Sequence, residues 1–238
     1  MTIDLFDMHM EIPIKCHHEI EESEREDRRI KELGERRRQE TLLKNSGLTG
    51  AMNDMTIANF KAREGTEKAL GFIKEYLANW PDMRREGTGF VLIGGYGNGK
   101  SHMAAAVVHE LLAKGIPASF QPVAELLKRI KATFDDSGRE TEHGITELMQ
   151  HMECLVLDDI GSQRMTHWAQ EYLFTLVDYR YRNKLPMIIT TNCSAVDGEG
   201  SLTDAIGGRI VDRLLERCIL IKVTATSYRR EIAKERGK

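Results

Sequence analysis

Residues 94–101 read GGYGNGKS, which fits the pattern G-x-x-x-x-G-K-[ST] in full. The stretch follows a short apolar run, FVLI at 90–93, and leads into SHMAAAVVHELLAKG at 101–115, which has the composition of a helix. Glycines permit backbone conformations in which consecutive N–H groups point at phosphate oxygens, and the positive end of the following helix faces the same anion. The order of strand, loop and helix therefore predicts a phosphate-binding loop of the P-loop nucleotide-binding class.

Two side chains of this loop have predicted roles of their own. Lys100 can place its ammonium on the β- and γ-phosphates of ATP, and Ser101 can ligate Mg²⁺ through its hydroxyl. The alternative is a chance glycine-rich turn, which the flanking strand and helix disfavour. The cofactor-binding residues predicted in this stretch are Gly94, Gly95, Tyr96, Gly97, Asn98, Gly99, Lys100, Ser101 and His102.

Short apolar runs alternate with longer helical stretches along most of the chain. The runs are FVLIG at 90–94, ASFQP at 118–122, CLVLDD at 154–159, MIITTN at 187–192 and CILIKV at 218–223. Such alternation predicts βαβ units, and therefore an α/β fold with a mostly parallel sheet covered by helices. Ahead of the first run, residues 67–80 carry apolar residues at helical spacing, and we expect Thr66 to cap this helix and Pro81 to end it.

Acidic and polar residues follow two of the predicted strands. Asp158 and Asp159 end the run that begins at Cys154, and ligands of open α/β sheets bind at the carboxyl ends of strands. Asp158 is expected to hold the hydrated magnesium and Asp159 to orient the attacking water, although an Asp-containing turn is the plain alternative. The next run ends in Thr190, Thr191 and Asn192, and a polar residue at this strand end could hydrogen-bond the γ-phosphate or the water; a Thr-Thr-Asn stretch that simply begins a turn is the alternative.

Two arginines lie one helical turn apart in GGRIVDRLLER at 207–217. Arg209 and Arg213 share a helical face because they are four residues apart. An arginine offered to the γ-phosphate of a neighbouring subunit would stabilise transition-state charge. A surface ion pair with Asp212 or Glu216 is the alternative explanation.

Composition narrows the class of protein further. The chain has 238 residues, of which 41% are hydrophobic and 30% charged, as in a globular protein. Its net charge of −3 argues against a strongly basic coat for nucleic acid but leaves room for a local basic face. The four cysteines form no CxxC pair, and no apolar run approaches the ~20 residues that span a bilayer. We therefore expect a cytoplasmic protein with reduced thiols and no membrane partner.

The N-terminal part of the sequence has a different character. Residues 19–44 are dominated by charges, including EESEREDRR and ERRRQE, and opposite charges recur three and four apart. This pattern predicts a helix that is either solvated or serves as an arm for a partner protein. We divide the chain into a helical, charged arm over residues 1–50 and an ATPase domain over residues 51–238.

A possible zinc site also lies in this part of the chain. Cys16, His17 and His18 are adjacent, and cysteine and histidine are the usual ligands of zinc. A structural site needs four well-spaced ligands, and His9 is the one other candidate nearby. A cluster without metal is therefore favoured.

Taken together, the motifs resemble those of the AAA+ ATPases of the replicative helicase loader group (the DnaC and DnaI type), which includes the IstB-like transposition helper ATPases. The motifs are GGYGNGKSH at 94–102, LVLDDIG at 155–161, IITTN at 188–192, GGRIVDRLLER at 207–217 and SYRRE at 227–231. The resemblance covers roughly residues 45–230, including a lead-in loop (residues 45–60) ahead of the ATPase core. It implies a P-loop NTPase three-layer sandwich with the AAA+ core.

The resemblance also implies roles for single residues. It makes Lys100 and Ser101 the Walker A pair, and Asp158 and Asp159 the Walker B pair. Asn192 matches the first sensor, and Arg229 matches the second sensor arginine. Arg213 matches the arginine finger, with Arg209 as a second candidate. Two features depart from the family pattern. Asp159 stands where many members have Glu, which would slow hydrolysis, and the sequence ends soon after Arg229, so that the C-terminal lid is reduced or absent.

The implied activity is the ATP-controlled delivery of a hexameric replicative helicase onto single-stranded DNA. The arm would grip the helicase, and ATP and Mg²⁺ would lie between self-associating subunits. The alternatives are a transposition helper that binds double-stranded DNA and a transposase, and an adaptor that binds ATP without hydrolysing it. Candidate contacts to single-stranded DNA, each of which could equally lie on a solvated helix face, are Lys128, Arg129, Lys131, Phe134, Tyr179, Arg180, Tyr181 and Arg182.

Overall fold

A computed structural model describes residues 2–5, 8–11, 17–135, 141–162, 165–193 and 195–237. The chain divides into two compact units, a smaller one that ends at Thr41 and a larger one that begins at Leu42. Within the described ranges, no helix is long and apolar enough to cross a bilayer.

The smaller unit contains a strand pair and most of a long helix. Strands β1 (Thr2–Leu5) and β2 (Met8–Glu11) pair antiparallel, and α1 spans His17–Asn45. The predicted charged helix is confirmed, whereas the strand pair was missed, because four-residue strands leave too short a pattern to detect. From residue 24 to 40 every residue of α1 is exposed, and its ion pairs, such as that between Arg36 and Glu40 at 3.1 Å, follow helical spacing. The zinc hypothesis concerns Cys16 and the side chains of His9, His17 and His18, which lie outside the described part of the structure.

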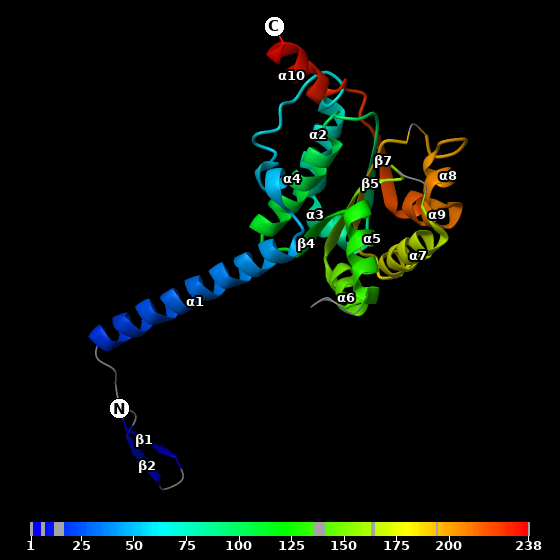
Figure 1. Ribbon diagram of the computed structural model, residues 1–238. Helices are drawn as coiled ribbons and strands as arrows, with labels where there is room; N and C mark the ends of the chain where they lie inside the picture. The colour runs from blue at the N-terminus through cyan, green and yellow to red at the C-terminus, as the bar shows by residue number, and fades with distance from the viewer. Residues whose placement is uncertain are drawn as a thin grey trace. The chain divides into compact units, whose positions relative to one another are not determined.

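The larger unit is built on a five-stranded parallel sheet with the order β4-β5-β6-β3-β7 (Figure 1). All five predicted strands are present. Their bounds are β3 Gly89–Ile93, β4 Ala118–Pro122, β5 Cys154–Ile160, β6 Met187–Thr191 and β7 Cys218–Lys222. Because the strands are parallel, their carboxyl ends meet at one edge of the sheet.

Helices cover both faces of this sheet, so that the predicted three-layer sandwich is confirmed. Alternate residues of β3 illustrate the division: Phe90 and Leu92 pack with α2, α3 and α4, while Val91 and Ile93 pack with α5, α6, α7 and α9. The helix bounds are α2 Glu67–Ala78, α3 Trp80–Glu86, α4 Lys100–Ala113, α5 Val123–Ala132, α6 Glu142–His151, α7 His167–Arg182, α8 Leu202–Ile206, α9 Gly208–Arg217 and α10 Tyr228–Arg236. Short 3₁₀ turns lie at Gly50–Asp54 and Thr133–Asp135.

Two details of α2 differ from the expectation. Thr66 precedes the helix, but its hydroxyl makes no cap; it donates to the carbonyl of Arg63 at 2.6 Å instead. Pro81 does not end α2, which stops at Ala78; it lies in the first turn of α3, where proline's missing N–H costs nothing.

The lead-in loop packs as part of the larger unit from its first residues. Ser46 is fully buried, and its carbonyl accepts a hydrogen bond from the backbone N–H of Phe120 in β4 at 2.6 Å. Gly47 has a φ of 71°, and a Cβ there would lie 2.3 Å from the carbonyl oxygen of Phe120. Residues 42–50, grouped with the arm from the sequence, therefore belong structurally with the sheet.

Arg180, a DNA-contact candidate from the sequence, is instead fully buried in α7. Its guanidinium donates to the carbonyls of Met149 at 2.7 Å, Met152 at 2.9 Å and Pro186 at 2.9 Å. Burial lowers the pKa of this guanidinium to about 10. The prediction that Arg180 meets DNA is wrong, because its donors are directed inward at the carbonyls that precede β5 and β6.

We expect Arg180→Met to lower the free energy of unfolding by about 3 kcal/mol, because it leaves buried carbonyls without a donor. Arg182→Met is the matched control, because the Arg182 side chain is 70% exposed and its partner Asp178 keeps an ion pair with Arg213, so that it should change stability by less than about 1 kcal/mol. Urea unfolding of both variants measures the difference, and equal stabilities would contradict a structural role for Arg180.

Candidate nucleotide-binding site

The predicted phosphate loop connects β3 to α4 at the carboxyl edge of the sheet. Gly97 and Gly99 have φ values of 71° and 99°, in the left-handed region that favours glycine. A Cβ on Gly97 would also lie 2.4 Å from Oγ of Ser227. The glycines thus allow both the turn of the loop and its close contact with the segment that follows β7.

Lys100, the first residue of α4, points back into the loop. Its ammonium donates to the carbonyls of Gly94 and Gly95, both at 2.7 Å, and to Oδ1 of Asn192 at 2.8 Å. Burial lowers the pKa of Lys100 to about 8; the carboxylates of Asp159 and Asp158 oppose this shift, and Arg229 adds to it. The cation is therefore held where the phosphate loop, the end of β5 and the end of β6 meet.

The two acidic residues at the end of β5 are fixed by Thr190 of β6. The Thr190 hydroxyl donates to Oδ1 of Asp158 at 2.6 Å and accepts the backbone N–H of Asp159 at 2.8 Å. Burial raises the pKa of Asp158, and hydrogen bonds from Thr190 and Ser101 oppose that rise. Thr190 is one of the three polar residues named from the sequence at this strand end, but its role in fixing Asp158 and Asp159 was not predicted.

Asp159 departs from regular strand geometry. Its φ is 56°, and the register between β5 and β6 shifts between Leu157 and Ile160. Such irregularities redirect a side chain, often next to a functional site. Here the carboxylate accepts a hydrogen bond from Nδ2 of Asn192, so that the predicted water-orienting residue and the predicted sensor are in direct contact.

These residues surround a cavity of about 380 Å³. Of the residues predicted from the sequence, the cavity is lined by Tyr96, Gly97, Asn98, Gly99, Lys100, Ser101, His102, Asp158, Asp159, Asn192 and Arg229. Gly94 and Gly95 contribute through their carbonyls, which bind Lys100. These predicted residues come from four segments that lie far apart in the sequence.

One wall of the cavity was not predicted. It is formed by Met55, Asn59, Phe60, Lys61, Arg63 and Tyr228. His102 connects this wall to α4, because its Nε2 lies 2.9 Å from the carbonyl of Thr56, and its ring meets that of Phe60 edge-on at 5.1 Å. The lead-in loop (residues 45–60) contains no basic residue and no phosphate-binding motif, so the sequence predicted a connecting loop here and not part of a nucleotide site.

The site also has the donors that a magnesium nucleotide requires. Hydroxyl and carboxylate oxygens are the ligands that Mg²⁺ prefers, and it takes few of them from protein because phosphates and water supply the rest. Ser101, in the first turn of α4, is hydrogen-bonded to Asp158 at the end of β5. The residues present therefore fit ATP with Mg²⁺.

Arg213 and Arg209 lie on α9 and do not line the cavity, judged on the residues that the structure describes. Arg213 donates through Nε to Oδ1 of Asp178 at 2.7 Å, and both guanidinium groups lie over the ring of Phe174, at 4.6 and 3.8 Å. The ion pair expected as the alternative forms with Asp178 of α7, not with Asp212 or Glu216.

Several of the remaining DNA candidates are accessible. Phe134 is 55% exposed and meets Trp168 edge-on at 5.7 Å, and Nζ of Lys131 lies 5.1 Å from the centre of the same indole. Lys128 is exposed beside them on α5, while Arg129 is half-buried. On α7, Tyr181 donates to Glu216, and Arg182 forms an ion pair with Asp178. The structure thus brings together Lys131 of α5, Phe134 of the following 3₁₀ turn and Trp168 at the start of α7.

Fold and site together define a P-loop nucleotide-binding protein of the AAA+ type. The sequence matches the family of IstB-like ATP binding proteins over residues 22–236, and the chain belongs to that family. The resemblance drawn from the motifs is thereby confirmed.

Known relatives agree with this assignment. The replicative helicase loader DnaC of Escherichia coli strain K12 is 28% identical over 189 residues, which cover 79% of this chain and 74% of DnaC. A crystal structure of the DnaC helicase loader superimposes with a TM-score of 0.65 at 26% identity, covering 74% of this chain and 99% of that one. The AMPPCP-bound DnaA of Aquifex aeolicus, with a TM-score of 0.60 at 21% identity over 79% of this chain and 55% of DnaA, shares the fold.

The lowered pKa of Lys100 gives the site a dependence on pH. Phosphate favours the charged ammonium, whereas the free protein loses that proton near pH 8. We expect the Kd for ATP to rise with pH above about 8, by up to tenfold per pH unit. Lys100→Arg is the control, because a guanidinium stays charged and its affinity should vary little between pH 7 and 9.5. Titration with a fluorescent ATP analogue measures both, and a flat profile for the wild type would contradict the assignment.

Proposed function

We propose that this protein is an ATP-controlled loader that delivers a hexameric replicative DNA helicase onto single-stranded DNA. The observation that carries the proposal is the similarity to the replicative helicase loader DnaC, which extends over 79% of the chain. The same similarity favours a loader over a transposition helper, the other activity for which this group of ATPases is known.

In this proposal the phosphate loop and Lys100 bind the phosphates of ATP. The N–H groups of the loop and the N-terminus of α4 supply a positive electrostatic field, and the ammonium of Lys100 shifts from loop carbonyls to phosphate oxygens. Ser101 and Asp158 would hold Mg²⁺, which neutralises charge on the phosphates when it is bound. Arg229, at the rim of the cavity, would bind the γ-phosphate from the opposite side.

Hydrolysis would depend on Asp159 and Asn192. The Asn192 amide donates to the Asp159 carboxylate, which leaves the second carboxylate oxygen to accept a proton from the attacking water. An aspartate reaches less far than the glutamate common at this position, so the water would be held less well and turnover would be slow. Slow hydrolysis suits a protein that holds a partner while ATP is bound and releases it afterwards.

Self-association would complete the site. Arg213 is turned away from the cavity of its own chain, so it would serve the nucleotide of the next subunit, where a guanidinium stabilises the charge of the transition state. Its ion pair with Asp178 and its position over the ring of Phe174 would orient the guanidinium for contact with the next subunit. Arg209 is the second candidate for this role.

Single-stranded DNA would contact the cluster on α5 and α7. Lys128 and Lys131 supply charge for the phosphate backbone, while Phe134 and Trp168 offer rings on which bases can stack. The charged helix of the arm would grip the helicase, and the complex would work in the cytoplasm. The competing proposals remain a transposition helper on double-stranded DNA and an adaptor that never hydrolyses ATP.

Turnover of Asp159 variants tests the switch. Asp159→Asn should reduce the rate of ATP hydrolysis by about a hundredfold, the contribution of a general base, with the Kd for ATP changed by less than about threefold. Asp159→Glu should hydrolyse faster than the wild type if reach limits the reaction. Negligible turnover that is unchanged in both variants would identify an adaptor instead of an enzyme.

The arm can be tested separately from the nucleotide site. Replacing Arg36, Arg37 and Arg38 with alanine should weaken binding to the hexameric helicase by about tenfold or more, because arginines often dominate interfaces. Nucleotide affinity should not change. The control replaces three exposed basic residues of the larger unit, Lys68, Lys74 and Arg85, with alanine. Equal capture of helicase by both triple variants, in a pull-down with ATP, would argue against the arm.

A further inference from the structure

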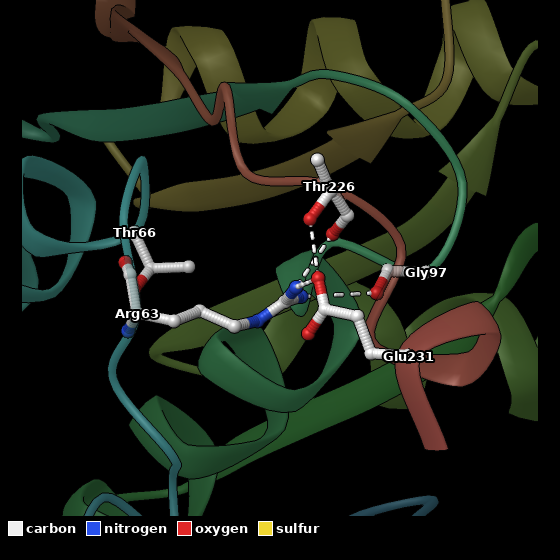
Figure 2. A network of polar contacts seen from close by, with 5 residues as sticks. All are labelled: Arg63, Thr66, Gly97, Thr226 and Glu231. Carbon is white, nitrogen blue, oxygen red and sulfur yellow. Dashed lines mark hydrogen bonds and ion pairs between the residues drawn. The ribbon is translucent and has the colours of Figure 1, made fainter. Parts of the chain in front are cut away.

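Three segments distant in the sequence meet at the carbonyl of Gly97 in the phosphate loop (Figure 2). This carbonyl accepts the backbone N–H of Tyr228 at 2.9 Å and Nη2 of Arg63 at 3.2 Å. Nearby, Nδ2 of Asn98 donates to the carbonyl of Val223 at 3.0 Å. The segment that follows β7 and the first residue of α10 therefore both contact the phosphate loop directly.

Arg63 is the centre of this network. Its Nη1 donates to the carbonyl of Thr226 at 2.7 Å and to Oε1 of Glu231 at 3.0 Å, while Nη2 reaches Gly97. Figure 2 shows the guanidinium between these groups, with the Thr226 hydroxyl also bonded to Glu231. The side chain of Arg63 is only 17% exposed. One residue thus connects the phosphate loop, the strand-to-helix segment and α10.

The backbone of Arg63 is fixed as well. Its N–H donates to Oγ1 of Thr66 at 2.9 Å, and the Thr66 hydroxyl donates back to the carbonyl of Arg63 at 2.6 Å. Thr66 is fully buried. This explains why Thr66 does not cap α2: its hydroxyl is used to hold the loop that carries Arg63.

Helix α10 depends on such polar contacts. None of its nine residues, all of which lie in the described part of the chain, is buried, so apolar packing contributes little to its position. The contacts that hold it include the N–H of Tyr228, the ion pair of Glu231 with Arg63, and the ring of Tyr228 below the Arg63 guanidinium at 5.2 Å; the Thr226 hydroxyl on Glu231 and the Lys61 ammonium over the Tyr228 ring add to them. Arg229 lies in the first turn between these two anchors and lines the cavity.

We propose that Arg63 is a positioning residue that clamps α10 to the phosphate loop and thereby sets Arg229 against the γ-phosphate. The inference rests on the proposed nucleotide site and adds a residue that acts through another. Three acceptors in different directions need the forked, planar guanidinium, and a lysine, which presents one compact charge, satisfies fewer of them. Because Gly97 is one acceptor, the clamp also ties the position of α10 to the conformation of the loop.

A double-mutant cycle with the intact chain tests the clamp. Arg63→Met should raise the Kd for ATP by about tenfold, as expected for lost hydrogen bonds to charged groups, and Arg63→Lys should fall between it and the wild type. In an Arg229→Met background, Arg63→Met should add less than about a further twofold, because both changes remove the same function. Arg85→Met, which removes an exposed arginine that pairs with Asp82, is the matched control and should leave the Kd unchanged.

Glu231→Gln provides a second route if Arg63→Met destabilises the protein. It removes only the charge at the far end of the clamp, and should weaken ATP binding severalfold and speed hydrogen exchange in residues 228–236. Wild-type affinity in Arg63→Met or in Glu231→Gln, or effects of Arg63→Met and Arg229→Met that multiply in full, would overturn the proposal. Lys100→Ala distinguishes failure of the nucleotide site from failure of the clamp. Tight ATP binding by Lys100→Ala would refute the nucleotide site itself. Loss of ATP binding in Lys100→Ala together with wild-type affinity in Arg63→Met would refute only the clamp.

Discussion

The hydrogen bonds of Lys100 are the interaction on which the rest of the site depends. The ammonium links the carbonyls of Gly94 and Gly95 to Asn192, which directly follows the neighbouring strand β6, and it lies within the field of the Asp158 and Asp159 carboxylates. A buried cation must keep its hydrogen-bond acceptors, because an unpaired charge is costly to bury, and it therefore fixes the positions of the loop, β5 and β6 relative to one another. The parallel sheet makes this possible, because it brings the carboxyl ends of strands that are far apart in the sequence to the same edge.

The same edge also receives the two segments that flank the ATPase core in sequence. The lead-in loop is bound through His102 and Phe60, and the segment after β7 lies against Gly94, Gly97 and Asn98. Nucleotide, lead-in loop and α10 therefore share the phosphate loop as a common support. A change in the ligand of the phosphate loop can therefore alter the positions of the lead-in loop and α10 through a small number of contacts. This is the arrangement expected of a switch.

Much of the fold and the site was predictable, because the signals were local. Strand, glycine loop and helix follow one another directly, and Asp158, Asp159 and Asn192 end strands whose parallel pairing places them together. What escaped prediction depends on contacts between distant residues. Arg180 looks like a surface base among Tyr179, Tyr181 and Arg182, yet the carbonyls that bury it come from other loops. Arg63 likewise stands in an ordinary charged stretch, and its partners lie at residues 97, 226 and 231.

The central claim is that ATP bound at this site controls delivery of a helicase. The most direct measurement counts hexameric helicase transferred to closed circular single-stranded DNA coated with single-strand-binding protein, with this protein and ATP present. The account predicts efficient transfer with the wild type and ATP, and transfer near the background without ATP or with Lys100→Ala. Equal transfer with and without this protein, or with wild type and Lys100→Ala alike, would contradict it.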